Sequence, residues 1–183
     1  MDDKNEDLYF LRGDKIYLRE IRASDINVNY YIWMNDPIVT QFLESRFYPN
    51  SIESLQEYVK QISNNPCEIL LGLFRKIDNK HVGNIKIGNI NWIHRVGDMG
   101  ILIGEKECWG KGYATEAIKI MVDYAFNVLN LHKIIAGCYS PNQGSIKAFQ
   151  KSGFEIEGTQ KKHFFYKGKY IDAILLGVLN TNL

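Results

Sequence analysis

The stretch of sequence that bears most directly on the fold reads Glu107-Cys108-Trp109-Gly110-Lys111-Gly112-Tyr113-Ala114-Thr115-Glu116-Ala117. It lies between a segment that alternates like a strand and a segment with helical periodicity. Its glycines allow one backbone segment to approach another closely. The first N–H groups of a helix have no partner within the helix, and with the positive end of the helix dipole they bind phosphate oxygens. The stretch therefore predicts a phosphate-binding turn at the start of a helix.

Three kinds of phosphate-binding turn have to be compared. A Walker loop needs a lysine followed by serine or threonine, whereas Lys111 is followed by Gly112. A Rossmann turn needs a third glycine where this chain has Thr115, and it opens the first β-α-β unit of a domain. Here the turn is preceded by segments that indicate an antiparallel meander. The remaining interpretation is a pyrophosphate loop for coenzyme A.

The residues after the turn predict an amphipathic helix of about 16 residues, because apolar side chains recur at intervals of three and four. These side chains are Ala114, Ala117, Ile118, Met121, Ala125, Val128 and Leu129. The chain before the turn predicts strands at residues 68–75, 81–90 and 97–104. The chain after the helix predicts a strand at 133–139, a helix at 142–152, a strand at 154–158, and a hairpin of 163–166 with 170–179.

The first third of the chain predicts one strand and two helices. Residues 15–21 alternate between apolar and polar side chains, as a half-buried strand does. Ser24 and Asp25 are candidate N-caps for a helix that Asp36-Pro37 ends. Ser51 begins a second helix. The whole order predicts an α/β chain with a mixed sheet (α+β), not a doubly wound one, because the central strands are joined too tightly for crossovers.

Length and composition exclude several classes of protein. The 183 residues predict a single domain over 1–183, with a tail at 1–13 and the folded part at about 15–179. Lys and Arg total 22 against 21 for Asp and Glu, which argues against a nucleic-acid partner. The longest apolar run, residues 173–179, is too short to cross a bilayer, and no signal peptide is expected. Three scattered cysteines suit a reducing compartment, so we expect a cytoplasmic protein.

Two motifs resemble one known family. The turn at residues 109–117 is followed by Tyr139-Ser140-Pro141-Asn142-Gln143-Gly144-Ser145-Ile146-Lys147-Ala148-Phe149-Gln150-Lys151-Ser152-Gly153-Phe154. Together they resemble the GNAT superfamily of acetyl-CoA-dependent N-acetyltransferases, and most of all its ribosomal-protein N-terminal and spermidine acetyltransferase types. The resemblance covers about residues 15–179. It implies a mostly antiparallel central sheet with splayed central strands, flanked by helices, and acetyl-CoA as the cosubstrate.

The resemblance also implies a set of residues that bind the cosubstrate. The family pattern of the loop is Arg or Gln, two residues, Gly, one residue, then Gly or Ala. Gly112 and Ala114 match it, and Trp109 replaces the Arg or Gln. The implied pyrophosphate site is Trp109, Gly110, Lys111, Gly112, Tyr113, Ala114 and Thr115. Ile101, Leu102 and Ile103 would face the pantetheine arm with their backbone, and Asn142 would bind its amides. Lys147 or Lys151 would meet the 3′-phosphate, or would simply be solvated.

The chemical step needs an acid and a base, and the sequence offers candidates for each. Many members of the family use a tyrosine as the acid, where this chain has Phe149. By resemblance, Ser145 is then the acid or hydrogen-bond donor to the thiolate, and Tyr139 is the alternative. Asp98 is the candidate base acting through water, or else part of an ion pair at the strand edge. His163 is a second candidate base, because it lies on the terminal hairpin close to where related enzymes often place a carboxylate near the acceptor, or else it faces solvent.

The expected reaction is direct attack of a primary amine on acetyl-CoA, without a covalent acyl-enzyme. The alternative is an acyl-CoA-binding module or sensor without catalysis. A protein N-terminus, a polyamine and an amino-sugar nucleotide all remain open as acceptors. No metal is expected, because no His, Cys or Asp cluster has ligand spacing. No nucleic-acid or membrane partner is expected, and a homodimer is plausible from the habit of the family.

Overall fold

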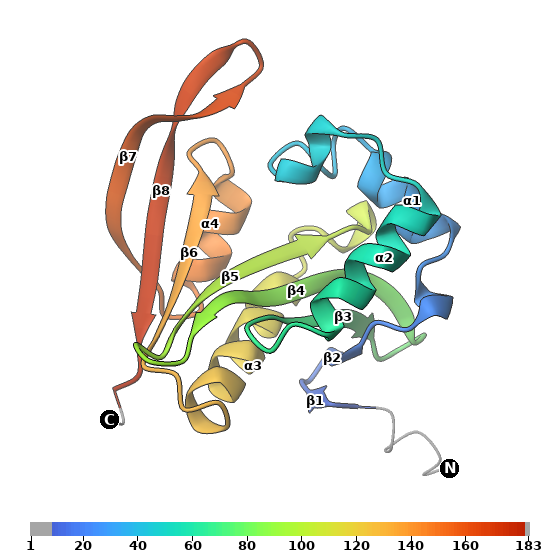
Figure 1. Cartoon of the computed structure of the whole chain (residues 1–183), viewed down its shortest axis with the longest axis horizontal. Coiled ribbons are helices and arrows are strands. Elements are labelled where there is room, and N and C mark those ends of the chain that lie inside the picture. The colour runs from blue at the N-terminus through green and yellow to red at the C-terminus, as the bar shows by residue number, and fades with distance from the viewer. Residues whose placement is uncertain (1–8, 182–183) are drawn as a thin grey trace.

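The computed structural model describes residues 9–181, in which eight strands form one sheet (Figure 1). The order across the sheet is β1-β2-β3-β4-β5-β6-β8-β7. The strands are β1 (Leu11–Arg12), β2 (Ile16–Glu20), β3 (Ile69–Arg75), β4 (Lys80–Asn91), β5 (Val96–Ile103), β6 (Lys133–Tyr139), β7 (Glu155–Tyr166) and β8 (Lys169–Leu179). Neighbouring strands are antiparallel except β5 and β6, which are parallel. The mixed, mostly antiparallel sheet is therefore confirmed.

Four α-helices accompany this sheet in the described part of the chain. They are α1 (Val28–Asn35), α2 (Ile52–Ser63), α3 (Tyr113–Asn127) and α4 (Gln143–Gln150), and the short 3-10 turns are η2 (Ala23–Asp25), η3 (Glu44–Phe47) and η4 (Lys106–Cys108). Side chains cap three of the α-helices: Asn27 caps α1, Ser51 caps α2 and Asn142 caps α4. Because α3 begins at a glycine, it has no side-chain cap.

The two faces of the sheet carry separate cores. Leu71 and Leu73 belong to the larger core, which includes Ile118 and Met121 of α3 and Phe149 of α4. The smaller core is formed by the region of α1 and α2, and its members are Ile21, Ile26, Tyr30, Trp33, Val39 and Leu55. Leu70 and Leu102 pack against this second core. Since successive side chains of a strand point to opposite faces, α3 and α4 cover one face, and α1 and α2 cover the other.

The centre of the sheet opens between β5 and β6. Residues 96–98 of β5 pair with residues 133–135 of β6, and the pairing stops there. Beyond that point β5 pairs only with β4, while β6 continues along β8 as far as Tyr139. Figure 1 shows the two strands diverging, with α4 beside β6. The expected splay of the central strands is confirmed, and it leaves backbone groups of two strand ends without a strand partner between them.

Several predicted boundaries were wrong. Residues 11–12 form strand β1 on the edge of β2, so the tail does not extend to residue 13; residues 1–8 lie outside the described part. The cap of α1 is Asn27, because Ser24 and Asp25 belong to η2. The predicted strands at 154–158 and 163–166 are one strand, β7, whose pairing with β8 shifts register twice. Those irregularities interrupt the alternation by which a strand is recognised in sequence.

None of the helices in residues 9–181 is both long and apolar enough to cross a membrane.

Candidate functional site

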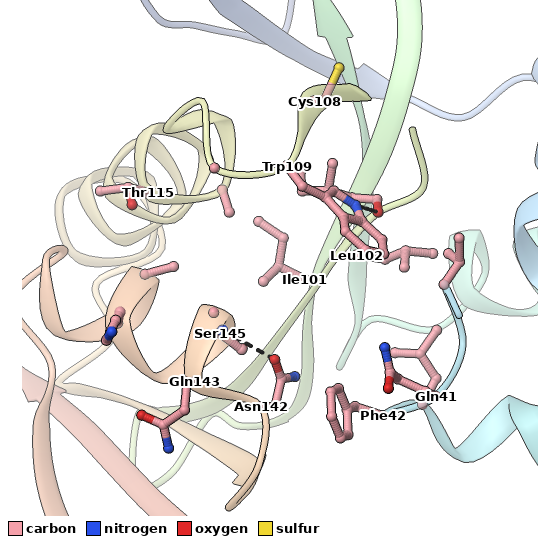
Figure 2. A pocket seen from close by; sticks show the side chains of 18 of the residues that line it. Gln41, Phe42, Ile101, Leu102, Cys108, Trp109, Thr115, Asn142, Gln143 and Ser145 are labelled. Carbon is pink, nitrogen blue, oxygen red and sulfur yellow. Dashed lines mark hydrogen bonds between the residues drawn. The ribbon is translucent and has the colours of Figure 1, made fainter. Parts of the chain in front are cut away.

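A cavity of about 540 Å³ lies where β5 and β6 diverge. Its wall is formed by the end of β5, the turn that leads into α3, the start of α4, and residues 38–43 of the loop after α1. Figure 2 shows how the labelled side chains of these four segments surround it. Cavities of this size accommodate small molecules and cofactors. The site is therefore a composite of segments that are far apart in the sequence.

The turn into α3 borders this cavity with the backbone of Gly110 and Gly112. Gly110 and Gly112 have φ angles of +73° and +87°, a region that favours glycine. Gly112 is the N-cap of α3, and it has no side chain to satisfy the N–H groups of the first helical turn. A Cβ atom built on either glycine would meet no protein atom within 4 Å. The turn thus combines unpaired donors, the positive end of a 15-residue helix and free space, which together suit a phosphate group.

Trp109 fixes the turn against β5. Its indole Nε1 donates a hydrogen bond to the carbonyl oxygen of Ile103 at 2.8 Å, drawn as a dashed line in Figure 2. The ring is half exposed and contributes to the wall of the cavity. Its role in this structure is therefore to hold the glycine turn next to the open edge of β5.

The opposite wall is the start of α4. Asn142 Oδ1 accepts a hydrogen bond from the backbone N–H of Ser145 at 3.2 Å, also shown in Figure 2. This cap uses the amide oxygen of Asn142 and leaves its amide nitrogen available to a ligand. Ser145 Oγ accepts a hydrogen bond from Cys138 Sγ at 3.4 Å. Lys147 and Lys151 bring positive charge to the same wall.

A third wall comes from the loop after α1, which aromatic and charged contacts hold in place. Arg46 donates from Nη1 to the carbonyl oxygen of Leu43 and to Tyr139 Oη, each at 2.7 Å, and from Nη2 to the carbonyl oxygen of Phe165 at 3.0 Å. Tyr166 Oη donates to Gln41 Oε1 at 3.1 Å. The loop is thereby joined to β6 and to the end of β7.

Most of the predicted cosubstrate residues meet at this cavity. Those that line it are Ile101, Leu102, Ile103, Trp109, Gly110, Gly112, Ala114, Thr115, Asn142, Ser145 and Lys147. Lys111 and Tyr113 do not line it. The side chain of Lys111 is exposed, and its carbonyl oxygen accepts from Lys15 Nζ. Tyr113 packs on the larger core. Residues that are adjacent in the motif therefore point in different directions, because the backbone of the turn is irregular.

The two predicted bases do not line the cavity. Asp98 lies in β5 where the pairing with β6 ends, and burial raises the pKa of its carboxyl, with Lys86 opposing the shift. His163 is exposed on β7, where its ring contacts Phe164. Neither side chain is placed for direct contact with a ligand in the cavity. A role for Asp98 would have to pass through water or through other residues.

Tyr139, the alternative acid, is engaged elsewhere. Its hydroxyl donates a short hydrogen bond to Glu44 and accepts one from Arg46, and its ring stacks on Phe164 with 3.9 Å between centroids. Burial raises the pKa of Tyr139, and the bond to Glu44 raises it further. The proton of this hydroxyl is therefore committed to a carboxylate outside the cavity.

Sequence reasoning singled out none of the residues 38–43 that form the third wall. Residues 38–43 carry no motif, and their place beside the cavity depends on contacts with residues about a hundred positions away. Pro141 and Gln143 were also missed, although they adjoin Asn142 in the second motif. Within residues 9–181, no three His, Cys, Asp or Glu side chains are grouped so as to hold a metal ion.

The diverging strands and the glycine turn beside them form the arrangement that the resemblance to the GNAT superfamily implies. The model of the acetyltransferase (GNAT) domain matches residues 15–155, and this chain belongs to the GNAT acetyltransferase family. It is 38% identical over 159 residues to the spermidine N(1)-acetyltransferase of Escherichia coli (strain K12), which covers 87% of this chain and 83% of the relative. It is 30% identical over 179 residues to the probable N-acetyltransferase YjcK of Bacillus subtilis (strain 168), covering 94% and 98%.

A solved structure extends the similarity to three dimensions. The crystal structure of spermidine N-acetyltransferase from Vibrio cholerae in complex with CoA and spermine matches with a TM-score of 0.82 at 26% identity, over 91% of this chain and 96% of that chain. The chain is accordingly an acetyl-CoA-dependent N-acetyltransferase, an enzyme that transfers the acetyl group of acetyl-CoA to an amine. The predictions of the family, the fold and the cosubstrate are confirmed.

Proposed function

We propose that this enzyme catalyses direct attack of an amine on acetyl-CoA, within a ternary complex. The observation that carries the proposal is that the open edge of β5, the glycine turn and the start of α4 line one cavity. The diphosphate would bind the N–H groups at Gly110–Thr115, and the pantetheine arm would pair with the backbone of residues 101–103. Lys147 and Lys151 would supply positive charge to the phosphates. The thioester would then lie near Ser145.

The buried cysteines argue against an acyl-enzyme. Burial raises the pKa of the Cys108 thiol and also that of Cys138. Arg75 Nη1 donates to Cys108 Sγ at 3.6 Å, and Cys138 is bonded to Ser145. A protonated, buried thiol is a poor nucleophile. Initial rates measured with both substrates varied should give intersecting double-reciprocal lines. Parallel lines would instead indicate an acyl-enzyme and contradict the ternary complex.

The requirements of amide formation assign a role to Ser145. The leaving thiol of CoA has a pKa near 8.5, so a hydrogen-bond donor at its sulfur gives a modest but useful stabilisation. Ser145 is the hydroxyl-bearing side chain of α4 that lines the cavity near the parting strands. We assign it to donate to the leaving sulfur. The attacking amine must be neutral, and Asp98, acting through water, is kept as the base.

We propose that the acceptor is an aliphatic amine with a second cationic group, of the polyamine type. The similarity to spermidine acetyltransferases supports this choice. Phe42 lines the cavity, and its ring lies 5.8 Å from Tyr139 and 5.3 Å from Tyr166, centroid to centroid. Aromatic faces attract cations, and the carboxylate of Glu44 lies just outside the cavity, bonded to Tyr139 and 4.0 Å from Arg46, with its side chain 70% exposed.

The same wall disfavours an amino-sugar nucleotide. Its phosphates would need free cationic donors, and the guanidinium of Arg46 is already bonded to three protein oxygens. A protein N-terminus lacks the second charge that Glu44 would recognise, unless a basic residue follows it. The polyamine therefore matches the described contacts better than either alternative.

A panel of amines tests the acceptor. Spermidine, a peptide with a free N-terminus and an amino-sugar nucleotide are each supplied with acetyl-CoA, and thiol release and product mass are measured. We expect spermidine to have the highest kcat/KM. Glu44→Gln should raise its KM about three- to fivefold, the size of an exposed charge interaction, and leave a monoamine unaffected. Glu20→Gln is the control, because Glu20 is a similarly exposed carboxylate paired with Arg22.

Acetylation of the peptide without acetylation of spermidine would overturn the polyamine assignment and leave acetyl transfer intact. If none of the amines causes thiol release from acetyl-CoA, both acetyl transfer to these amines and the polyamine assignment are contradicted.

We further propose that the enzyme works in the cytoplasm, where acetyl-CoA is available and its free cysteines stay reduced. We also propose that it forms a homodimer, which is the habit of the family. Light scattering after size exclusion tests the second point, and a monomer mass would contradict it.

A further inference from the structure

Cys138 is a buried side chain that the proposed reaction leaves without a role. It lies on β6 beyond the point where β5 diverges, and only 2% of the residue is exposed. It does not line the cavity, but its Sγ is 3.4 Å from Ser145 Oγ, which does. The thiol therefore contacts Ser145 from the side away from the cavity.

The contact determines how the Ser145 hydroxyl is oriented. A serine hydroxyl has one proton to donate and lone pairs that accept. Cys138 Sγ donates to Ser145 Oγ and occupies an acceptor position, while Asn142 Oδ1 holds the backbone N–H of Ser145. With the thiol hydrogen on the side of β6, the hydroxyl proton of Ser145 has to point elsewhere, and the open direction is the cavity.

We propose that Cys138 is a positioning residue for acetyl transfer: its S–H group turns the O–H of Ser145 toward the sulfur of bound CoA. This inference rests on the proposed function. In the step concerned, the amine nitrogen forms a bond to the carbonyl carbon, the C–S bond breaks and its electron pair goes to sulfur. Ser145 stabilises that thiolate by donating a hydrogen bond, and it keeps its proton. The proton that the nitrogen then carries leaves through water to the base kept above, Asp98.

The surroundings of Cys138 keep its thiol in the donor form. Burial raises the pKa of the thiol, and the negative charge of Asp98 raises it further, against a smaller opposing effect of the Ser145 bond. A neutral thiol has a proton to donate, whereas a thiolate would accept from Ser145 and turn the hydroxyl away from CoA. Asp98 therefore supports the same orientation from the side of β5, without contact with the substrate.

Four variants and a control test the proposal, with the best amine of the panel as acceptor. Cys138→Ala removes the donor and should lower kcat three- to tenfold, the value of one hydrogen bond, with the acetyl-CoA KM unchanged. Cys138→Ser supplies an O–H donor and should restore kcat to within twofold. Ser145→Ala should lower kcat about ten- to thirtyfold, the value of one hydrogen bond to a charged sulfur. The double variant Cys138→Ala/Ser145→Ala should have the same kcat as Ser145→Ala alone. Cys67→Ala removes a thiol outside the site and should leave kcat unchanged.

The outcomes separate this inference from the proposed function. Amine turnover by the wild-type enzyme tests acetyl transfer independently of every variant. If the kcat of Cys138→Ser is as low as that of Cys138→Ala, Cys138 acts by packing and the proposal is wrong. The same holds if the effects of Cys138→Ala and Ser145→Ala on kcat multiply in the double variant. If Ser145→Ala keeps full kcat, the assignment of Ser145 and the role of Cys138 fall together, while acetyl transfer stands.

Discussion

The two halves of the cavity are built in different ways. On the side that we propose for acetyl-CoA, the turn at 110–115 is shaped by its own backbone, and the start of α4 is capped by its neighbour in sequence, Asn142. On the side that we propose for the acceptor, the loop at residues 36–48 is held by side chains that contact β6 and β7. The sequence separations of its main contacts are 93, 95, 119 and 125 residues.

This difference has a functional consequence. A backbone site tolerates change in its side chains, as Trp109 in place of the family's Arg or Gln illustrates, and so the same cosubstrate can be kept while sequences diverge. A site made from long-range side-chain contacts changes its shape with single substitutions. We infer that the acceptor side sets the choice of amine, and that the two sides can be impaired separately.

The largest expected effect is on the cofactor side. Gly112→Val places a branched side chain in the open space of the turn, where no protein atom lies within 4 Å of its Cβ. The side chain would occupy the position of the diphosphate, and we expect the acetyl-CoA KM to rise more than tenfold while the amine KM changes less than twofold. Steady-state rates with each substrate varied in turn measure both constants.

A matched control separates this effect from backbone strain. Gly168 has a φ angle of +80° and equally open space, but it lies in the turn between β7 and β8. Gly168→Val carries a similar conformational cost of about 1–2 kcal/mol and should lower Tm by about 5 °C without raising the acetyl-CoA KM. An equal rise of that KM in the two variants would contradict a phosphate site at Gly112.

A smaller effect is expected from a substitution on the acceptor side, and it should impair use of the amine while leaving CoA binding unchanged. Arg46→Ala removes the bonds that join the loop to Tyr139 and Phe165. Bonds of a charged donor are the stronger class, so we expect kcat/KM for the amine to fall about tenfold. The dissociation constant of CoA, measured by calorimetry, should stay within twofold. Arg22→Ala, which removes an exposed guanidinium paired with Glu20, is the control and should leave both unchanged. Weaker CoA binding by Arg46→Ala would contradict the inference that the two sides can be impaired separately.

The same comparison explains how far the sequence could predict the molecule. The strand at 133–139 and the helix that follows the glycine turn are local patterns, and the structure confirms both. The positions of Asn142 and Ser145 in the cavity were also predicted, since a short motif carries them. The cavity-lining residues 38–43 were not, because the place of their loop depends on the contact of Arg46 with Tyr139 across the fold.

The misplaced candidates have a similar cause. Tyr139 could not be discounted from sequence, since its partners Glu44 and Arg46 come from that loop. Lys111 and Tyr113 belong to the motif but point away from the cavity, which depends on the φ angles of two glycines. Where the backbone is irregular, the sequence has no periodicity from which the direction of a side chain could be predicted.

Calorimetry with fragments of the cosubstrate tests the central claim, that the backbone turn at Gly110–Thr115 grips the diphosphate. CoA should bind the wild-type enzyme at one site per chain, dephospho-CoA should bind only moderately more weakly, and pantetheine, which has no diphosphate, should give no measurable binding. Pantetheine binding as tight as that of CoA, or neither heat nor a rise in Tm with CoA, would contradict the claim.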